Sequence, residues 1–140
     1  MKDTRRHARK VVRSMYENDR FSQLLGIKIQ KVEPGSCVLK MKITKEMVNG
    51  FHTVHGGVTF AFADSALAFA SNSHGRLSVA LEASISYPKP VHVGDTLTAD
   101  AEEVSVTNKT GVYLITITNQ RKQRVAFFKG TVYRTSKEIG

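Results

Sequence analysis

The sequence predicts an α+β fold in which a curved antiparallel sheet wraps around one long central helix, with a further helix at the N-terminus. An almost unbroken run of small and apolar residues fills 58–72, which is longer than a typical strand and indicates a helix buried on nearly every side. Six shorter runs have strand character, and the short turns between neighbouring runs favour antiparallel pairing. Such a sheet must wrap the apolar helix to bury it.

The chain begins with a charged, amphipathic stretch over residues 4–18, which is expected to form a surface helix capped by Thr4. Its predicted inward stripe consists of Val11, Val12, Met15 and Tyr16. Residues 21–25 predict a further short turn that ends at Gly26, because glycine is a common stop after a helix.

Two strands are expected before the central helix and four after it. The first two cover residues 27–33 and 36–43, and Pro34-Gly35 between them suits the central positions of a type II turn. The other four are expected over residues 79–87, 96–106, 112–118 and 125–134. Residues 96–106 show the clearest alternation of apolar and polar side chains, as expected for a half-buried strand.

The central stretch contains one residue that does not match its surroundings. Asp64 lies within the apolar run, where an ionised carboxylate without a partner is costly to bury. Gly57 lies two helical turns earlier on the same face, about 10 Å away along the axis. The first turn of a helix presents free N–H groups and would polarise a carbonyl oxygen placed there. This combination suits acyl transfer to water. The alternative is that the Asp64 carboxylate only pairs with another group inside the core.

The spacing of these residues resembles that of a known family. Asn49, His55-Gly56-Gly57 and Asp64-Ser65-Ala66 match the N-x(5)-H-G-G-x(6)-D pattern of hotdog-fold acyl-CoA thioesterases, most closely the branch typified by the phenylacetic-acid-degradation thioesterase. Residues 85–90 and 94–99 look like the strand-turn-strand signature of the same family. The resemblance therefore implies a hotdog fold and hydrolysis of acyl-CoA thioesters.

The resemblance also implies roles for the residues of the pattern. Asp64 would act as general base on a water molecule or attack the thioester itself. The backbone N–H of Gly57 would polarise the thioester carbonyl. Asn49 would face the catalytic carboxylate of a partner subunit, and His55 would position the loop and the oxyanion site. A plain turn role for Asn49 and a structural role for His55 stay open. Residues 21–25 would close over one edge of the substrate pocket.

Coenzyme A enters only as part of the substrate, and no other cofactor is expected. Gly56, at the same helix entry, is expected to contact the substrate. Lys89, Lys109 and Thr110 resemble nucleotide-contacting positions of the family, and a solvated surface role is the alternative for each. No metal site is expected, because the histidines outside the pattern show no metal-ligand spacing.

The length of 140 residues fits one domain, expected to span 1–140 with a basic N-terminal helix in 1–20. Hydrophobic residues make up 41% and charged residues 24%, as in a soluble globular protein. No membrane span is expected, because Asp64 interrupts the longest apolar run. The single Cys37 excludes an internal disulfide and is expected to fill core, which is consistent with a cytoplasmic location.

The formal net charge of +9 is concentrated near the N-terminus. The cluster consists of Arg5, Arg6, Arg9, Lys10 and Arg13. It is typical of a solvated helix face, which we favour over a nucleic-acid-binding module. It would also suit the polyanion coenzyme A or an acidic acyl carrier protein, so carrier-protein thioesterase is the main alternative function. Neither a nucleic acid nor a membrane is an expected partner.

Other functions of the same fold are less compatible with this sequence. A non-catalytic acyl-CoA-binding domain is expected to lack Asp64, and a dehydratase would carry a catalytic histidine in the helix region.

Apolar residues on both faces of 112–118 predict that the sheet is buried further by association with another chain. The resemblance implies homodimers, often paired into homotetramers, with active sites at subunit interfaces.

Overall fold

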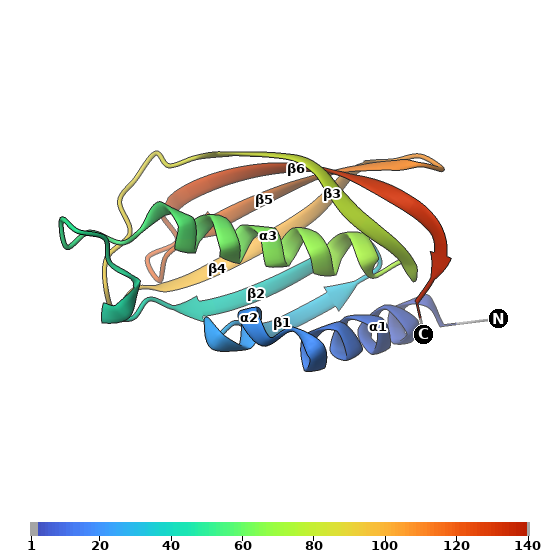
Figure 1. Cartoon of the computed structure of the whole chain (residues 1–140), viewed down its shortest axis with the longest axis horizontal. Helices are drawn as coiled ribbons and strands as arrows, with labels where there is room; N and C mark the ends of the chain where they lie inside the picture. Colours follow the sequence, from blue (N-terminus) through green and yellow to red (C-terminus); the bar gives the residue numbers. More distant parts are fainter. Residues whose placement is uncertain (1–2, 140) are drawn as a thin grey trace.

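The computed structural model describes residues 3–139, so Met1, Lys2 and Gly140 of the predicted domain 1–140 lie outside the described residues. Its elements are α1 (Thr4–Asn18), α2 (Arg20–Leu24), β1 (Lys28–Glu33), β2 (Ser36–Lys42), the 3-10 turn η1 (Lys45–Met47), α3 (Gly56–Asn72), β3 (Arg76–Ser86), β4 (Thr96–Val106), β5 (Thr110–Thr118) and β6 (Arg124–Glu138). Figure 1 shows α3 lying across one face of a curved sheet, with α1 beside β1. The architecture confirms the predicted α+β hotdog fold.

The sheet has six antiparallel strands in the order β1-β2-β4-β5-β6-β3. β1 and β2 form a hairpin through Gly35, whose φ of +82° fits the predicted type II turn. After α3 the chain returns as β3 at the far edge, where β6 is its one strand partner among residues 3–139. Residues 87–95 then lead back to β4 between β2 and β5, so β1 and β3 are the two edges.

α3 is buried because its side chains fill the concave face of the sheet. Phe62 of α3 is fully buried together with Tyr113 of β5 and Phe128 of β6. Gly130 of β6 lies directly under the helix, and a Cβ there would come within 2.5 Å of the Leu67 side chain. The helix can approach the sheet this closely because glycine has no side chain at that point.

β5 begins at Thr110 rather than at residue 112, and β3 and β6 also extend beyond their predicted ends. β3 begins at Arg76 rather than at residue 79, and β6 continues to Glu138 rather than ending at residue 134. The added segments of β3 and β6 pair with each other, with Arg76 opposite Glu138 and Ser78 opposite Arg134. The pairing partner of each segment lies far away in the chain, so local alternation does not reveal it.

Both N-terminal helices are capped by an aspartate. At α1 the cap is Asp3, whose carboxylate accepts two first-turn N–H groups, and not the predicted Thr4. At α2 the cap is Asp19, which accepts the Ser22 N–H at 2.9 Å and the Ser22 hydroxyl at 2.6 Å. The Ser22 Oγ lies 2.8 Å from the Ser65 Oγ of α3, so α2 is attached to the central helix.

Three features bear on the expectations drawn from composition. Cys37 is buried in β2, as expected for a core residue. Among residues 3–139, none of the helices has both the length and the apolar character needed to cross a membrane. The same residues contain no cluster of three or more His, Cys, Asp or Glu side chains placed to hold a metal ion.

Candidate active site

The start of α3 is built by the His55-Gly56-Gly57 segment. His55 is the N-cap, and its Nδ1 accepts the Gly57 N–H at 2.9 Å. The Val58 N–H donates to the His55 carbonyl at 3.0 Å and closes the first turn. His55 therefore holds the helix start together, and it occupies the N–H that was predicted to polarise the substrate.

Gly56 supplies the other backbone groups at this end of the helix. Its carbonyl accepts the hydroxyl of Tyr87, just after β3, at 2.9 Å. Desolvation raises the pKa of Tyr87, so the hydroxyl keeps the proton that it donates. The Gly56 N–H donates to no acceptor within residues 3–139. The helix start thus offers one free N–H beside one that His55 occupies.

Asp64 lies on the outward side of α3, where its side chain is exposed in the single chain. Within the described part of the chain, its carboxylate forms no ion pair or hydrogen bond. Despite this exposure, the surrounding apolar residues desolvate the charged form and raise the pKa of Asp64 above its ordinary 3.8. The carboxylate is therefore free to accept a proton.

Asn49 organises the loop that precedes α3. Its Oδ1 accepts the N–H groups of Phe51 and Thr53 at 2.9 and 3.3 Å, and the Thr53 hydroxyl at 3.1 Å. The turn role considered for Asn49 is therefore present. Its Nδ2 makes no bond to residues 3–139, which leaves this donor available to a substrate or a second chain.

An apolar pocket of about 620 Å³ opens beside the helix start. The pocket is lined by Phe21, Leu24, Leu25, Thr44, Glu46, Met47, His55, Gly57, Val58 and Ala61. Phe21 and Leu24 of α2 are 57% and 80% exposed, so they present apolar surface to this opening instead of packing in the core. α2 thus forms the wall opposite the start of α3.

Lys89 lies at the same end of the molecule, in the connection between β3 and β4. It lines a largely polar hollow of about 510 Å³ with His92, Asp95 and Arg121 among its other residues. The Asp95 carboxylate accepts the His92 N–H and the Gln120 side-chain amide, both at 2.9 Å. A cationic side chain and a hydrogen-bonded wall therefore lie near the start of α3.

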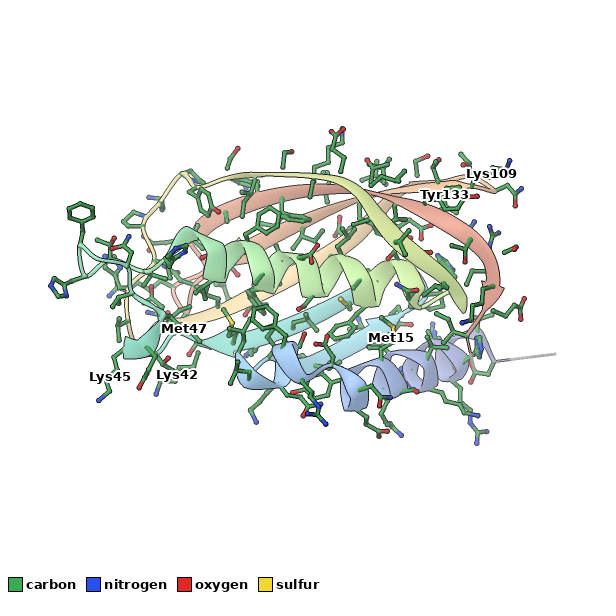
Figure 2. All side chains as sticks on the ribbon, viewed as in Figure 1. Met15, Lys42, Lys45, Met47, Lys109 and Tyr133 are labelled. Atoms are coloured by element: carbon green, nitrogen blue, oxygen red, sulfur yellow. The ribbon has the colours of Figure 1, made fainter. Side chains whose placement is uncertain are left out.

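Lys109 and Thr110 lie far from the start of α3. Figure 2 shows Lys109 at the opposite end of the molecule from Met47, which lines the pocket at the start of α3. The Thr110 hydroxyl lies 2.8 Å from that of Thr107, so it stabilises the turn between β4 and β5. Within one chain, the structure does not bring these two residues together with Asp64.

Tyr87 is the residue of this site that sequence reasoning missed. Its hydroxyl binds the backbone of Gly56 across 31 positions of sequence. A tyrosine at the end of a strand, before Pro88, is compatible with many roles, so no local signal points to the helix start. The contact arises only because β3 ends beside α3.

Comparisons with known proteins show the family of this chain. Residues 51–126 match the family model of the thioesterase superfamily. The acyl-coenzyme A thioesterase PaaI of Escherichia coli K12 is 43% identical over 126 residues, which is 90% of each chain. The solved structure of the E. coli PaaI protein from the phenylacetic acid degradation operon superposes with a TM-score of 0.95 at 39% identity, covering 99% of this chain and 100% of that one.

Another relative was solved with a ligand. The smu.793 protein of Streptococcus mutans UA159, bound to acetyl-CoA, superposes with a TM-score of 0.77 at 32% identity, covering 80% of this chain and 90% of that one. The matched region includes Asp64 and the start of α3. The chain therefore belongs to the thioesterase superfamily, and it is a hotdog-fold hydrolase related to PaaI, as the motif predicted.

Proposed function

We propose that this thioesterase hydrolyses acyl-CoA thioesters to the free acid and coenzyme A. The observation that carries the proposal is the unpaired Asp64 carboxylate, with its raised pKa, two turns from a helix start that presents N–H groups. The relatives support the substrate class, because PaaI is named an acyl-coenzyme A thioesterase and the S. mutans structure contains acetyl-CoA.

In the proposed reaction, Asp64 accepts a proton from water while the water oxygen bonds to the thioester carbonyl carbon. The negative charge that develops on the carbonyl oxygen is stabilised at the start of α3. The carbon–sulfur bond then breaks, and the coenzyme A sulfur takes up the proton. Direct attack by Asp64, followed by hydrolysis of the resulting anhydride, is the second route.

The carbonyl oxygen would be received by the N–H groups of Gly56 and Gly57. The Gly56 N–H is free, and the Gly57 N–H becomes available when the His55 ring turns away from it. A donor of this kind is worth roughly 3–4 kcal/mol in the transition state. His55 would therefore control whether the site offers one donor or two.

A complete site requires a second chain. The base and the oxyanion donor act on one carbonyl group, yet Asp64 and Gly57 lie about 10 Å apart along the helix axis. Antiparallel pairing of two β3 edges would set two α3 helices side by side in opposite directions. The helix start of one chain, with its Asn49 amide, would then meet Asp64 of the other. We propose a homodimer on these grounds, which can pair further into a homotetramer.

The two parts of the substrate would use different surfaces. The acyl group fits the apolar pocket between α2 and the start of α3. The polar part of coenzyme A would contact Lys89 of the same chain, with Lys109 and Thr110 supplied by a neighbouring chain. Aromatic, short and medium acyl groups are all candidates, so the panel used for the assay should include all three.

We also propose a cytoplasmic location. The Cys37 thiol is packed inside the sheet, and burial, together with the charge of Asp100, raises its pKa to about 12. A buried, unpaired thiol of this kind is compatible with a reducing compartment.

A thioester carried by acyl carrier protein is the second candidate substrate. The cationic residues of α1 are exposed, which favours an acidic protein partner. They are Arg5, Arg6, Arg9, Lys10 and Arg13. Hydrolysis of carrier-protein thioesters without hydrolysis of the corresponding CoA thioesters would favour this candidate.

The test is release of free thiol from a panel of aryl- and alkyl-CoA thioesters by the wild type, Asp64→Asn and Asp100→Asn. Loss of a general base costs roughly 10²–10⁴ in rate, so we expect Asp64→Asn to lose at least 10²-fold. Asp100, an exposed aspartate on β4, is the matched control and should retain activity. Unchanged hydrolysis by Asp64→Asn would exclude the proposed base.

A further inference from the structure

One peptide group at the start of α3 is hydrogen-bonded on both of its sides. The Gly56 carbonyl accepts the hydroxyl of Tyr87 at 2.9 Å, and the Gly57 N–H donates to Nδ1 of His55 at 2.9 Å. The carbonyl and the N–H belong to one planar unit, because the peptide bond joins the Gly56 carbonyl carbon to the Gly57 nitrogen. Tyr87 and His55 therefore hold opposite sides of the group that carries the proposed oxyanion donor.

This peptide group needs support from outside the helix. It lies between two glycines, whose backbone is less restricted than that of any other residue type. It also lies in the first turn of α3, where the N–H groups have no acceptor within the helix. When the His55 ring turns away to free the Gly57 N–H, Tyr87 is the one side chain among residues 3–139 that stays hydrogen-bonded to the group.

The position of Tyr87 is well defined by its surroundings. It directly follows Ser86, the last residue of β3, which pairs with Phe127 of β6. Pro88 comes next and restricts the backbone of the preceding residue to extended conformations. A Cβ added at Gly56 would lie 3.3 Å from the Tyr87 hydroxyl oxygen and 3.4 Å from its Cζ. The hydroxyl can therefore reach the carbonyl because Gly56 has no side chain.

The hydroxyl of Tyr87 also strengthens the donor on the other side of the peptide group. Hydrogen bonds in a chain polarise one another, so a carbonyl that accepts a hydrogen bond makes the N–H of the same amide a stronger donor. Desolvation raises the pKa of Tyr87, which keeps the hydroxyl protonated and able to donate. The Gly57 N–H is thereby strengthened where negative charge develops on the thioester oxygen.

We propose that Tyr87 is a positioning residue for the oxyanion donor of this thioesterase. Its hydroxyl orients and polarises the 56–57 peptide group, so the Gly57 N–H stays directed at the thioester oxygen after His55 releases it. In this role Tyr87 acts through the peptide group and not by contact with the substrate. The inference deepens the proposed function and rests on it for the reaction that the donor serves.

The alternative is a purely structural role, in which the hydroxyl only attaches the end of β3 to α3. Tyr16 offers a matched control, because its hydroxyl also donates to a main-chain carbonyl, that of Ile27. Tyr87→Phe and Tyr16→Phe each remove one such hydrogen bond and keep the aromatic ring. Tyr87 is 49% exposed, so loss of its hydroxyl leaves the fold intact.

The first measurement is the chemical shift of the Gly57 amide nitrogen, recorded by NMR without substrate. Loss of the hydrogen bond to the preceding carbonyl makes the amide less polarised and moves the nitrogen resonance upfield. We expect this change at Gly57 in Tyr87→Phe and not in Tyr16→Phe. In Tyr16→Phe the corresponding change should appear at Lys28, which follows Ile27 in the chain.

The second measurement is thiol release from the CoA thioester that the wild type hydrolyses best. The donor stabilises the charged transition state more than the neutral carbonyl of bound substrate, so Tyr87→Phe should lower kcat and leave KM nearly unchanged. We expect kcat to fall about three- to tenfold, as for loss of one hydrogen bond between neutral groups. Tyr16→Phe should keep the kcat of the wild type, although both variants should lose some thermal stability.

An unchanged Gly57 resonance in Tyr87→Phe would overturn the inference, and so would a wild-type kcat in that variant. An equal fall of kcat in Tyr16→Phe and Tyr87→Phe would also overturn it, because it would show a structural role alone. Each of these results leaves the proposed function intact if the wild type hydrolyses thioesters. If the wild type hydrolyses none while the Gly57 resonance responds to Tyr87→Phe, the proposed function is wrong and Tyr87 still positions the peptide group.

Discussion

Asp64 owes its proposed role to an unusual local environment. The neighbouring residues on α3 are small and apolar, so the carboxylate loses hydration without gaining a hydrogen bond from residues 3–139. The ionised form becomes less stable, and the carboxylate becomes a better proton acceptor. Loss of this environment would lower the basicity of Asp64 even if the side chain kept its position.

The pH dependence of hydrolysis follows from this shift. A raised pKa means that Asp64 is protonated at a higher pH than an ordinary aspartate, and a protonated carboxyl cannot accept a proton from water. We therefore expect kcat/KM to fall on the acid side, with a midpoint above the ordinary value of 3.8. A pH–rate profile from pH 3 to 8, with ionic strength fixed, measures it.

The control for this profile is Asp100→Asn, which should keep the acid limb of the wild type. An acid limb centred at or below 3.8 would contradict the environment described for Asp64. Any activity that remains in Asp64→Asn should lack that limb, because the titrating group is gone.

α2 is the element on which the acyl pocket depends. It has five residues, too few for a stable isolated helix, so it needs its cap and its attachment to α3. Asp19 binds Ser22 through both carboxylate oxygens, and Ser22 in turn contacts Ser65. The position of Phe21 and Leu24 at the pocket therefore rests on a small network of polar groups.

Replacement of Asp19 should loosen this wall. Asp19→Ala removes the cap, which typically costs about 1 kcal/mol, and frees the Ser22 hydroxyl. We expect KM for bulky acyl-CoA substrates to rise several-fold while KM for acetyl-CoA and kcat change less. Steady-state kinetics across the panel measures the difference, with thermal unfolding to show that the fold is intact.

Glu17→Ala is the matched control, because it removes a carboxylate two residues before Asp19, in the last turn of α1, without removing the cap of α2. It should leave KM unchanged for every substrate. An equal rise of KM for acetyl-CoA and for bulky substrates in Asp19→Ala would show that α2 does not shape the acyl pocket.

At the scale of the whole molecule, the β3 edge is the feature that a single chain leaves incomplete. Val79 and Leu81 are 46% and 60% exposed, and Ala80 and Glu82 between and beside them are exposed as well. The outer edge of β3 has no neighbouring strand among the described residues, because β3 pairs with β6 alone. An exposed apolar edge of this kind favours pairing with a second chain.

Leu81→Lys should separate the proposed dimer. At a two-fold interface the new lysine would lie near its own copy, and like charges close to one another repel. We expect sedimentation velocity at micromolar concentration to shift from dimer or tetramer to monomer. Thiol release should be lost with it, because Asp64 and the helix start would belong to different chains.

Val104→Lys is the control for added charge, since Val104 is also exposed and lies on β4, three strands from β3. It should keep the dimer. A wild type that sediments as a monomer, or a monomeric Leu81→Lys with full activity, would contradict a composite active site.

Much of the fold could be predicted from the sequence because its signals are local. The apolar run predicts the helix α3, the alternation of side chains predicts the strand β4, and the glycine predicts the β1–β2 turn. The spacing of Asn49, the His-Gly-Gly segment and Asp64 also identified the family, because a motif is read without knowing the fold around it.

Only the tertiary structure shows which strands pair and which distant side chains contact the site. It put β3 beside β6, extended both strands by pairing them, and brought Tyr87 to the backbone of Gly56. It also placed Lys109 at the end of the molecule that holds Arg134. The bond from the Gly57 N–H to His55 is local, between residues two apart, but it is a choice of hydrogen-bond partner that the motif spacing does not reveal. Each of these contacts joins groups through three-dimensional packing or a choice of hydrogen-bond partner. Periodicity and spacing along the chain carry no record of either.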